Sequence, residues 1–236
     1  MSAARARRLL ERAGLGLHGA LALASYDALA PAPWRSAAWA PHARGALVVG
    51  NAGRALFERF LASRERELRD DPLDAYTRRV LGEAARLFDP PAAVGFYADR
   101  REGVYLPLVA LAQRAGFGTP GRIGVLIHPE FGPWIAIRAV MLVGVPLVET
   151  DPLRFDPCTG CPAPCASACV GAAVGPSGLD ARKCYDTRLG VPACAGACAA
   201  RSACVVCPEH AYSAAQLAHH MKIRGVSPGT PARRDG

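Results

Sequence analysis

All nine cysteines of this 236-residue chain follow residue 157, and this uneven distribution limits the possible folds more than any other feature. Four of them fall within twelve residues, in CTGCPAPCASAC from Cys158 to Cys169. The segment 151–212 is short in aliphatic residues and rich in Ala, Gly and Pro, so it cannot build a sizeable core of its own. We therefore expect a metal, or packing on the rest of the chain, to hold it in place.

The composition indicates a globular protein of one main domain with an appendage. Hydrophobic residues make up 51% and charged residues 20%, without an apolar run long enough to span a membrane, so we expect no membrane partner. The net charge of +8 comes almost wholly from arginine, and no nucleic-acid-binding motif accompanies it, so we do not expect a nucleic-acid partner. An odd number of cysteines and an N-terminus that reads poorly as a signal peptide favour a cytoplasmic location over export.

Hydrophobic periodicity predicts helices and strands that alternate before the cysteines. We expect helices at 3–13 and 104–115, and strands at 15–24, 45–50, 123–128 and 135–148. The predicted fold class is therefore α/β (α+β), a sheet-and-helix domain followed by a small, irregular, ferredoxin-like cysteine-rich segment. The predicted domains are 1–150 for the sheet, 151–212 for the cysteine segment, and 213–236 for a C-terminal helix and disordered tail.

The stretch LAQRAGFGTPGRIGVLIHPEFGPWIAIRAVMLVGVPL, residues 111–147, is the most informative one before the cysteines. Its spacing Gly116-x-Gly118-x-x-Gly121 mimics a dinucleotide-binding fingerprint. Here, however, the glycines follow a predicted helix and precede a predicted strand, the reverse of the order which that fingerprint needs. The glycines instead favour a tight turn before a strand, or close approach to a flat ligand.

AGFG…GRIGVLIHPEFGPW resembles the segment shared by epoxyqueuosine reductases, respiratory reductive dehalogenases and the cobalamin chaperone linked to methylmalonic aciduria with homocystinuria, type C. HPEFGPWIAIRA, from His128 to Ala139, is most similar to the chaperone. The resemblance implies a nitroreductase-like fold and a bound cobalamin for residues 1–150. It also implies that the residues matching the shared pattern shape or flank the corrin site: Gly116, Gly118, Gly121, Arg122, His128, Gly132, Trp134 and Arg138.

Simpler roles stay open for several of these residues. His128-Pro129 and Gly132-Pro133 suit turns between strands, and Trp134 suits a core position. Arg138 suits an anionic partner, such as a phosphate or the glutathione that the chaperone family uses. Asp99 and Glu102 are candidate catalytic acids, near the place of the reductases' aspartate, although the flanking sequence does not match.

The cysteine spacing departs from the ferredoxin pattern Cys-x2-Cys-x2-Cys-x3-Cys-Pro, by one extra residue before Cys165 and a missing proline after Cys169. Two [4Fe-4S] clusters remain compatible with it, with Cys184 as a spare or alternative ligand. Zinc held by the Cys-x2-Cys pairs, or a degenerate module of free thiols, are the alternatives. The predicted cluster sets are Cys158, Cys161, Cys165 and Cys207 for one, and Cys169, Cys194, Cys198 and Cys204 for the other.

The leading hypothesis is a cobalamin-binding, iron-sulfur-linked reductive protein that processes cobalamin or performs cobalamin-dependent reduction. Its electrons would come from an unidentified donor or from a thiol such as glutathione, and it would be a cytoplasmic protein that could form a homodimer. The alternatives are a small [4Fe-4S] electron-transfer protein and a zinc-stabilised interaction module. Epoxyqueuosine reduction is a further, less favoured hypothesis.

Overall fold

The computed structural model describes residues 2–221, so the predicted disordered tail lies largely outside the described residues. The chain divides by its contacts into two compact units. The sheet unit comprises Met1–Gly118 and Ile135–Arg154, and the cysteine unit comprises Thr119–Trp134 and Phe155–Gly236. Residues 119–134 thus pack with the cysteines, whereas the predicted domain 1–150 includes them. The predicted domains remain a prediction.

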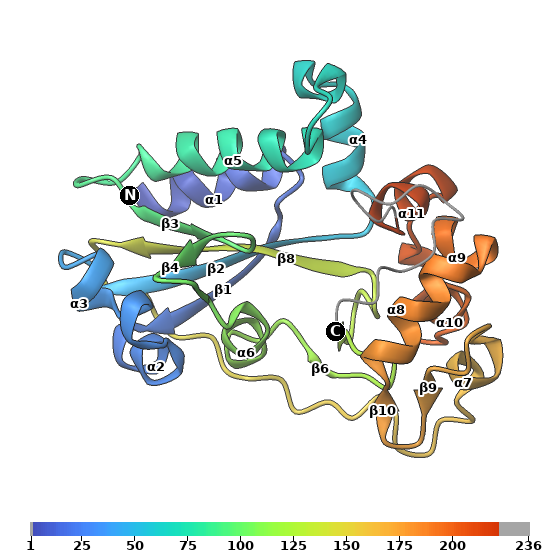
Figure 1. The fold of residues 1–236 in the computed structure, drawn as a ribbon. Helices are drawn as coiled ribbons and strands as arrows, with labels where there is room; N and C mark the ends of the chain where they lie inside the picture. The colour runs from blue at the N-terminus through green and yellow to red at the C-terminus, as the bar shows by residue number, and fades with distance from the viewer. Residues whose placement is uncertain (1, 222–236) are drawn as a thin grey trace. The chain divides into compact units, whose positions relative to one another are not determined.

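A four-stranded antiparallel sheet forms the centre of the sheet unit, in the order β1-β2-β8-β3 (Figure 1). The predicted strands at 45–50 and 135–148 are its two central strands. A bulge between Val49 and Gly50 shifts the register of β2 against β8. The bounds of the four strands are Leu17–Ala22 for β1, Gly45–Ala52 for β2, Ala93–Phe96 for β3 and Ile135–Val143 for β8.

Helices cover both faces of this sheet, which explains why its central strands read as continuous apolar runs. Side chains alternate across a strand, so Leu47 and Met141 pack with α1, α4 and α5, while Val48 and Val140 are buried on the other side. Figure 1 shows α1 and α5 along one face, and α2 and α6 along the other. The helices are α1 (Ser2–Arg12), α2 (Leu23–Leu29), α3 (Ser36–Trp39), α4 (Ala55–Leu61), α5 (Pro72–Ala85) and α6 (Leu108–Arg114).

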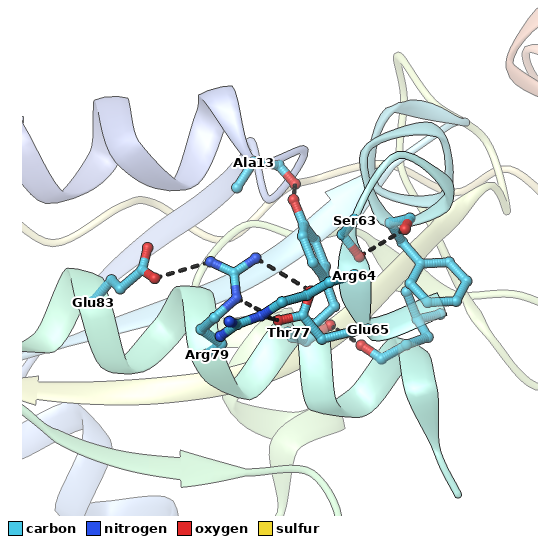
Figure 2. A network of polar contacts seen from close by, with 10 residues as sticks. Ala13, Ser63, Arg64, Glu65, Thr77, Arg79 and Glu83 are labelled. Atoms are coloured by element: carbon cyan, nitrogen blue, oxygen red, sulfur yellow. Dashed lines mark hydrogen bonds and ion pairs between the residues drawn. The ribbon is translucent and has the colours of Figure 1, made fainter. Parts of the chain in front are cut away.

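A buried carboxylate ties the turn after α4 to α5 (Figure 2). Glu65 lies in the short 3-10 helix Arg64–Glu67 and is only 6% exposed. Its Oε1 accepts a hydrogen bond of 2.6 Å from Nε of Arg79, whose Nη1 donates to Glu83 at 2.9 Å. The hydrogen bond from Arg79 lowers the pKa of Glu65 to about 2. Glu65 therefore stays ionised at neutral pH although it is buried.

Short helices and two-residue strands make up the cysteine unit, and few of its side chains are buried. No helix within residues 2–221 is long and apolar enough to cross a membrane. The bounds are Thr119–Pro120 for β6, Leu126–Ile127 for β7, Pro164–Ala168 for α7, Val174–Gly175 for β9, Gly178–Leu179 for β10, Ala181–Gly190 for α8, Pro192–Gly196 for α9, Ala199–Ser202 for α10 and Ala214–Met221 for α11.

Candidate functional site

The glycine-rich loop 119–134 folds back on itself inside the cysteine unit. β6 pairs with β7, and His128 and Gly132 exchange two main-chain hydrogen bonds of 2.9 and 2.8 Å. Gly132 has a φ of 55°, and a Cβ there would come within 2.1 Å of the carbonyl oxygen of Val206. Glycine is needed at this position because the chain around Val206 already fills the space that a side chain would occupy.

His128 is fixed by local contacts. Its Nδ1 accepts a hydrogen bond of 3.0 Å from the main-chain N–H of Glu130, and its ring lies 4.9 Å from that of Phe131. Burial lowers the pKa of His128 below its usual value. The imidazole is therefore neutral at neutral pH, with Nδ1 as the acceptor.

Trp134 lies in the small core of the cysteine unit. Its ring packs edge-to-face against Tyr212 at 5.4 Å, and the guanidinium of Arg201 lies over both rings, at 5.3 and 4.6 Å. Arg201 also donates a hydrogen bond of 3.1 Å from Nε to the carbonyl of Pro133. These contacts match the core position considered for Trp134 and contribute about 0.5–2 kcal/mol per cation–π contact.

Arg138 lies on β8 in the sheet unit, where its Nε donates a hydrogen bond of 2.9 Å to Oδ1 of Asn51 on β2. Asn51 is fully buried, and its Nδ2 has no hydrogen-bond partner within residues 2–221. A buried amide donor without a partner costs about 1–3 kcal/mol. This pair therefore favours a polar group of a ligand in the sheet unit.

The eight predicted corrin residues do not all lie in one unit. Gly121 donates its main-chain N–H to the carbonyl of Val125 at 2.9 Å, and Arg122 lines a cavity among the cysteines. Gly116, Gly118 and Arg138 belong to the sheet unit, whereas Gly121, Arg122, His128, Gly132 and Trp134 belong to the cysteine unit.

The two candidate acids lie in and beside the hairpin of β4 (Arg100–Arg101) and β5 (Val104–Tyr105). Asp99 has both carboxylate oxygens engaged, one with Nη2 of Arg78 at 2.7 Å and the other with the N–H of Phe96 at 3.0 Å. Glu102 is exposed in the turn, with a φ of 50°. Local structure accounts for the position of Asp99, and catalysis by either residue stays a prediction.

Four thiols from three segments line one cavity in the cysteine unit. We call them the first cysteine group: Cys158, Cys161, Cys165 and Cys204. Asp156 orders the first of these segments, since its Oδ1 accepts main-chain hydrogen bonds from Cys158 and Thr159. Cys165 lies on α7, and burial followed by the neighbouring thiols raises the pKa of Cys165. The cavity has a volume of about 20 Å³.

A second set of four thiols lines a larger cavity of about 120 Å³. We call it the second cysteine group: Cys169, Cys184, Cys194 and Cys198. Cys184 lies on α8. Asp180 precedes the first residue of this helix, and its carboxylate caps the helix by accepting the N–H of Lys183 at 2.9 Å. Cys194 lies on α9. The second group also lies next to Arg188 of α8.

This arrangement differs from the predicted cluster sets. Cys184, predicted to be a spare or an alternative ligand, lines the larger cavity, and Cys204 lies with Cys158 instead of Cys169. Cys207, predicted to be a ligand, lines neither cavity, and its Sγ lies 3.1 Å from the carbonyl of Pro129, to which the thiol donates. Its φ of 48° turns the chain at this residue. The spacing of the cysteines in the sequence does not show that α8 brings Cys184 to the second group. A predicted helix over residues 181–190 would have suggested it.

Main-chain N–H groups point at sulfur in the second group. Ala173 donates to Sγ of Cys169 at 3.3 Å, and Arg201 donates to Sγ of Cys198 at 3.4 Å. All nine cysteines are half-buried and free of disulfides. Among residues 2–221, no three His, Cys, Asp or Glu side chains meet closely enough to hold a single metal ion. Four thiols around one cavity are the kind and number of ligands that a [4Fe-4S] cluster uses.

Comparison with known proteins finds relatives for part of the sequence and for the fold. No family model matches the chain. An epoxyqueuosine reductase of Staphylococcus aureus is 41% identical over 78 residues, which are 33% of this chain and 20% of that protein. The chain therefore matches only about a fifth of the length of this curated relative.

Solved structures extend the likeness over nearly the whole chain, at lower identity. The B12-trafficking protein CblC of C. elegans has a TM-score of 0.55 at 13% identity, covering 94% of this chain and 92% of that one. The catabolic reductive dehalogenase NpRdhA has a TM-score of 0.56 at 17% identity, covering 88% of this chain and 32% of that one. The predicted resemblance to epoxyqueuosine reductases, reductive dehalogenases and the cobalamin chaperone is confirmed. The predicted nitroreductase-like fold class, with a cysteine-rich segment, is confirmed as well.

Proposed function

We propose that this protein is an iron-sulfur-linked reductive protein that works on or with cobalamin, either processing it or using it to reduce a substrate. The observation that carries the proposal is the gathering of eight of nine cysteines into two sets of four around separate cavities. The likeness to CblC and to a reductive dehalogenase, in a chain with this cysteine segment, supports the cobalamin part.

The second cysteine group fits a [4Fe-4S] cluster. It offers four thiols, a cavity of about 120 Å³ and main-chain N–H groups that donate to two of its sulfurs. The first group offers the same number of thiols around a much smaller cavity, so a cluster there rests on the thiol set. A bound cluster supplies one-electron transfer. The residues of the chain hold it, hydrogen-bond its thiolate ligands and limit their contact with water.

The predicted corrin residues give cobalamin weaker support. The chain around Val206 fills the space that a Cβ of Gly132 would occupy, and Trp134 packs against Tyr212. A corrin role for these two residues stays a prediction. Asn51, with its unsatisfied Nδ2 beside Arg138, favours a polar ligand in the sheet unit. We therefore assign no reaction step to cobalamin, and its binding stays a proposal that rests on the resemblance.

Anaerobic reconstitution with iron and sulfide tests the cluster proposal. We expect brown protein with two clusters per chain, counted by iron and sulfide analysis. Cys184→Ser should lose one of the two clusters, whereas Cys207→Ser should keep both. Of these two cysteines, Cys184 lines a cavity and Cys207 does not. A colourless protein that binds zinc instead would favour the zinc-stabilised module. Loss of a cluster in Cys207→Ser, with none lost in Cys184→Ser, would favour the cluster sets predicted from sequence.

Titration with cobalamin under reducing conditions separates the leading function from the small electron-transfer protein. Binding should change the visible spectrum of the added cobalamin. Replacing Asn51 with leucine should weaken this binding if the buried amide meets a polar group of the ligand. A protein that keeps its clusters and leaves the cobalamin spectrum unchanged at high concentration would favour the electron-transfer alternative.

A further inference from the structure

The second cysteine group has a cationic neighbour that its sequence spacing does not reveal. Arg188 lies on α8 four residues after Cys184, a spacing that brings two side chains to the same face of a helix. It lines the larger cavity together with the four thiols of the group. A positive charge thus stands at the wall of the cavity that best fits a cluster.

The guanidinium of Arg188 is anchored on one side and unsatisfied on another. Its Nη2 donates a hydrogen bond of 2.5 Å to the main-chain carbonyl of Met221 at the end of α11. Its Nε is buried and has no hydrogen-bond partner within residues 2–221. The hydrogen bond to Met221 holds the guanidinium, and with it the positive charge, beside the cavity.

Each of the two cavities has one arginine in its lining. Arg188 of α8 lines the cavity of the second cysteine group, and Arg122 lines the cavity of the first. Of these two, Arg188 lies beside the larger cavity, which is the one that offers room for a cluster.

We propose that Arg188 is a positioning residue that raises the reduction potential of the cluster in the second cysteine group. This inference rests on the proposed function. A [4Fe-4S] cluster takes up one electron, from an external reductant in a titration, and its reduced form carries one more negative charge than its oxidised form. A fixed positive charge at the wall of the cavity favours the more negative form.

Redox titration of the reconstituted protein, followed by electron paramagnetic resonance, tests this inference. Arg188→Gln removes the charge and should lower the reduction potential of one cluster by about 59 mV. For a one-electron couple, this shift corresponds to a tenfold change in the equilibrium constant for reduction. The potential of the other cluster should stay unchanged. Arg188→Lys keeps a positive charge without Nε–H and should give a smaller shift, which serves as a second variant if Arg188→Gln takes up its clusters poorly.

Arg182→Gln is the matched control. It removes the same charge from the same helix, but its side chain is 87% exposed and paired with Asp186, so water screens it. We expect both potentials to match those of the unaltered protein. If Arg188→Gln and Arg188→Lys both bind two clusters with unchanged reduction potentials, the inference about Arg188 is overturned, while the proposed function stands. Absence of any cluster from the unaltered protein would overturn the proposed function, and this inference with it.

Discussion

The two units of this protein reach a folded state by different physical means. The sheet unit buries a continuous core that includes Leu47, Phe57, Leu81 and Phe96, each at most 6% exposed. The helices of the cysteine unit bury little, and those that carry cysteines, α7, α8 and α9, contain no buried residue at all. Apolar burial accounts for the first unit. The second has only a small core around Trp134 and Tyr212, so the proposed function makes its stability depend on what its thiols bind.

Removing the proposed clusters should have the largest effect on the difference between the two units. In an apoprotein prepared with a chelator under reducing conditions, we expect the cysteine unit to unfold and the sheet unit to remain. Structural zinc contributes about 10–16 kcal/mol to the folding of zinc-finger peptides, and metal ligation that couples to folding in this way should outweigh the few apolar contacts of the cysteine unit. Hydrogen exchange would show it, with rapid exchange in α8 and lasting protection in β8. Equal protection of α8 in apoprotein and holoprotein would show that packing alone holds the cysteine unit.

A core truncation should have a smaller effect, confined to the sheet unit. Leu81→Ala on α5 removes a side chain that is 1% exposed, and such a change costs about 2–5 kcal/mol. Leu61→Ala on α4 is the matched control, because Leu61 is 44% exposed and should cost well under 1 kcal/mol. Urea unfolding of the two variants measures the difference. Similar midpoints would mean that α5 does not depend on this core.

The smallest effect concerns the Glu65–Arg79 pair and depends on pH. The pKa of Glu65 is lowered from 4.5 to about 2, so its contribution to stability is complete above pH 4.5 and is lost as the pH falls towards 2. Glu65→Gln should cost about 1–3 kcal/mol at pH 7 and flatten the stability curve between those two values. Glu67→Gln is the control, because this exposed carboxylate pairs only with exposed Arg66. Parallel stability curves for all three proteins would contradict the assignment.

The sheet unit was the more predictable of the two. The apolar runs at 45–50 and 135–148 predicted its central strands, because a strand buried on both faces is apolar at successive positions. The predicted strand at 15–24 ends at Ala22, where α2 begins, and the predicted strand at 123–128 shrinks to two residues. β3 was missed, since Ala93–Phe96 is short and contains a glycine. Short elements depend on tertiary pairing that no local pattern records.

The candidate site was predictable in its chemistry and less so in its arrangement. Nine clustered thiols indicated a metal-type site, but the spacing could not show which four share a cavity. Cys207 precedes a proline, the familiar ending of a ferredoxin motif, yet its left-handed conformation goes with a thiol that binds Pro129. Cys184 stands alone in the sequence, and α8 brings it to the second group. Arg188 went unnoticed because no helix was predicted over residues 181–190, and it is α8 that brings Arg188 to the same face as Cys184.

The connection of the two units has a practical consequence for anyone who wishes to separate them. The chain leaves the sheet unit after Gly118, returns at Ile135 to form β8, and leaves again after Arg154. The cysteine unit is therefore made of two separate segments of the sequence. A truncation at residue 154 would strand the loop 119–134 without Val206 to pack on, and grafting the cysteine unit onto another protein would require two insertions, because a single fused tail would lack that loop.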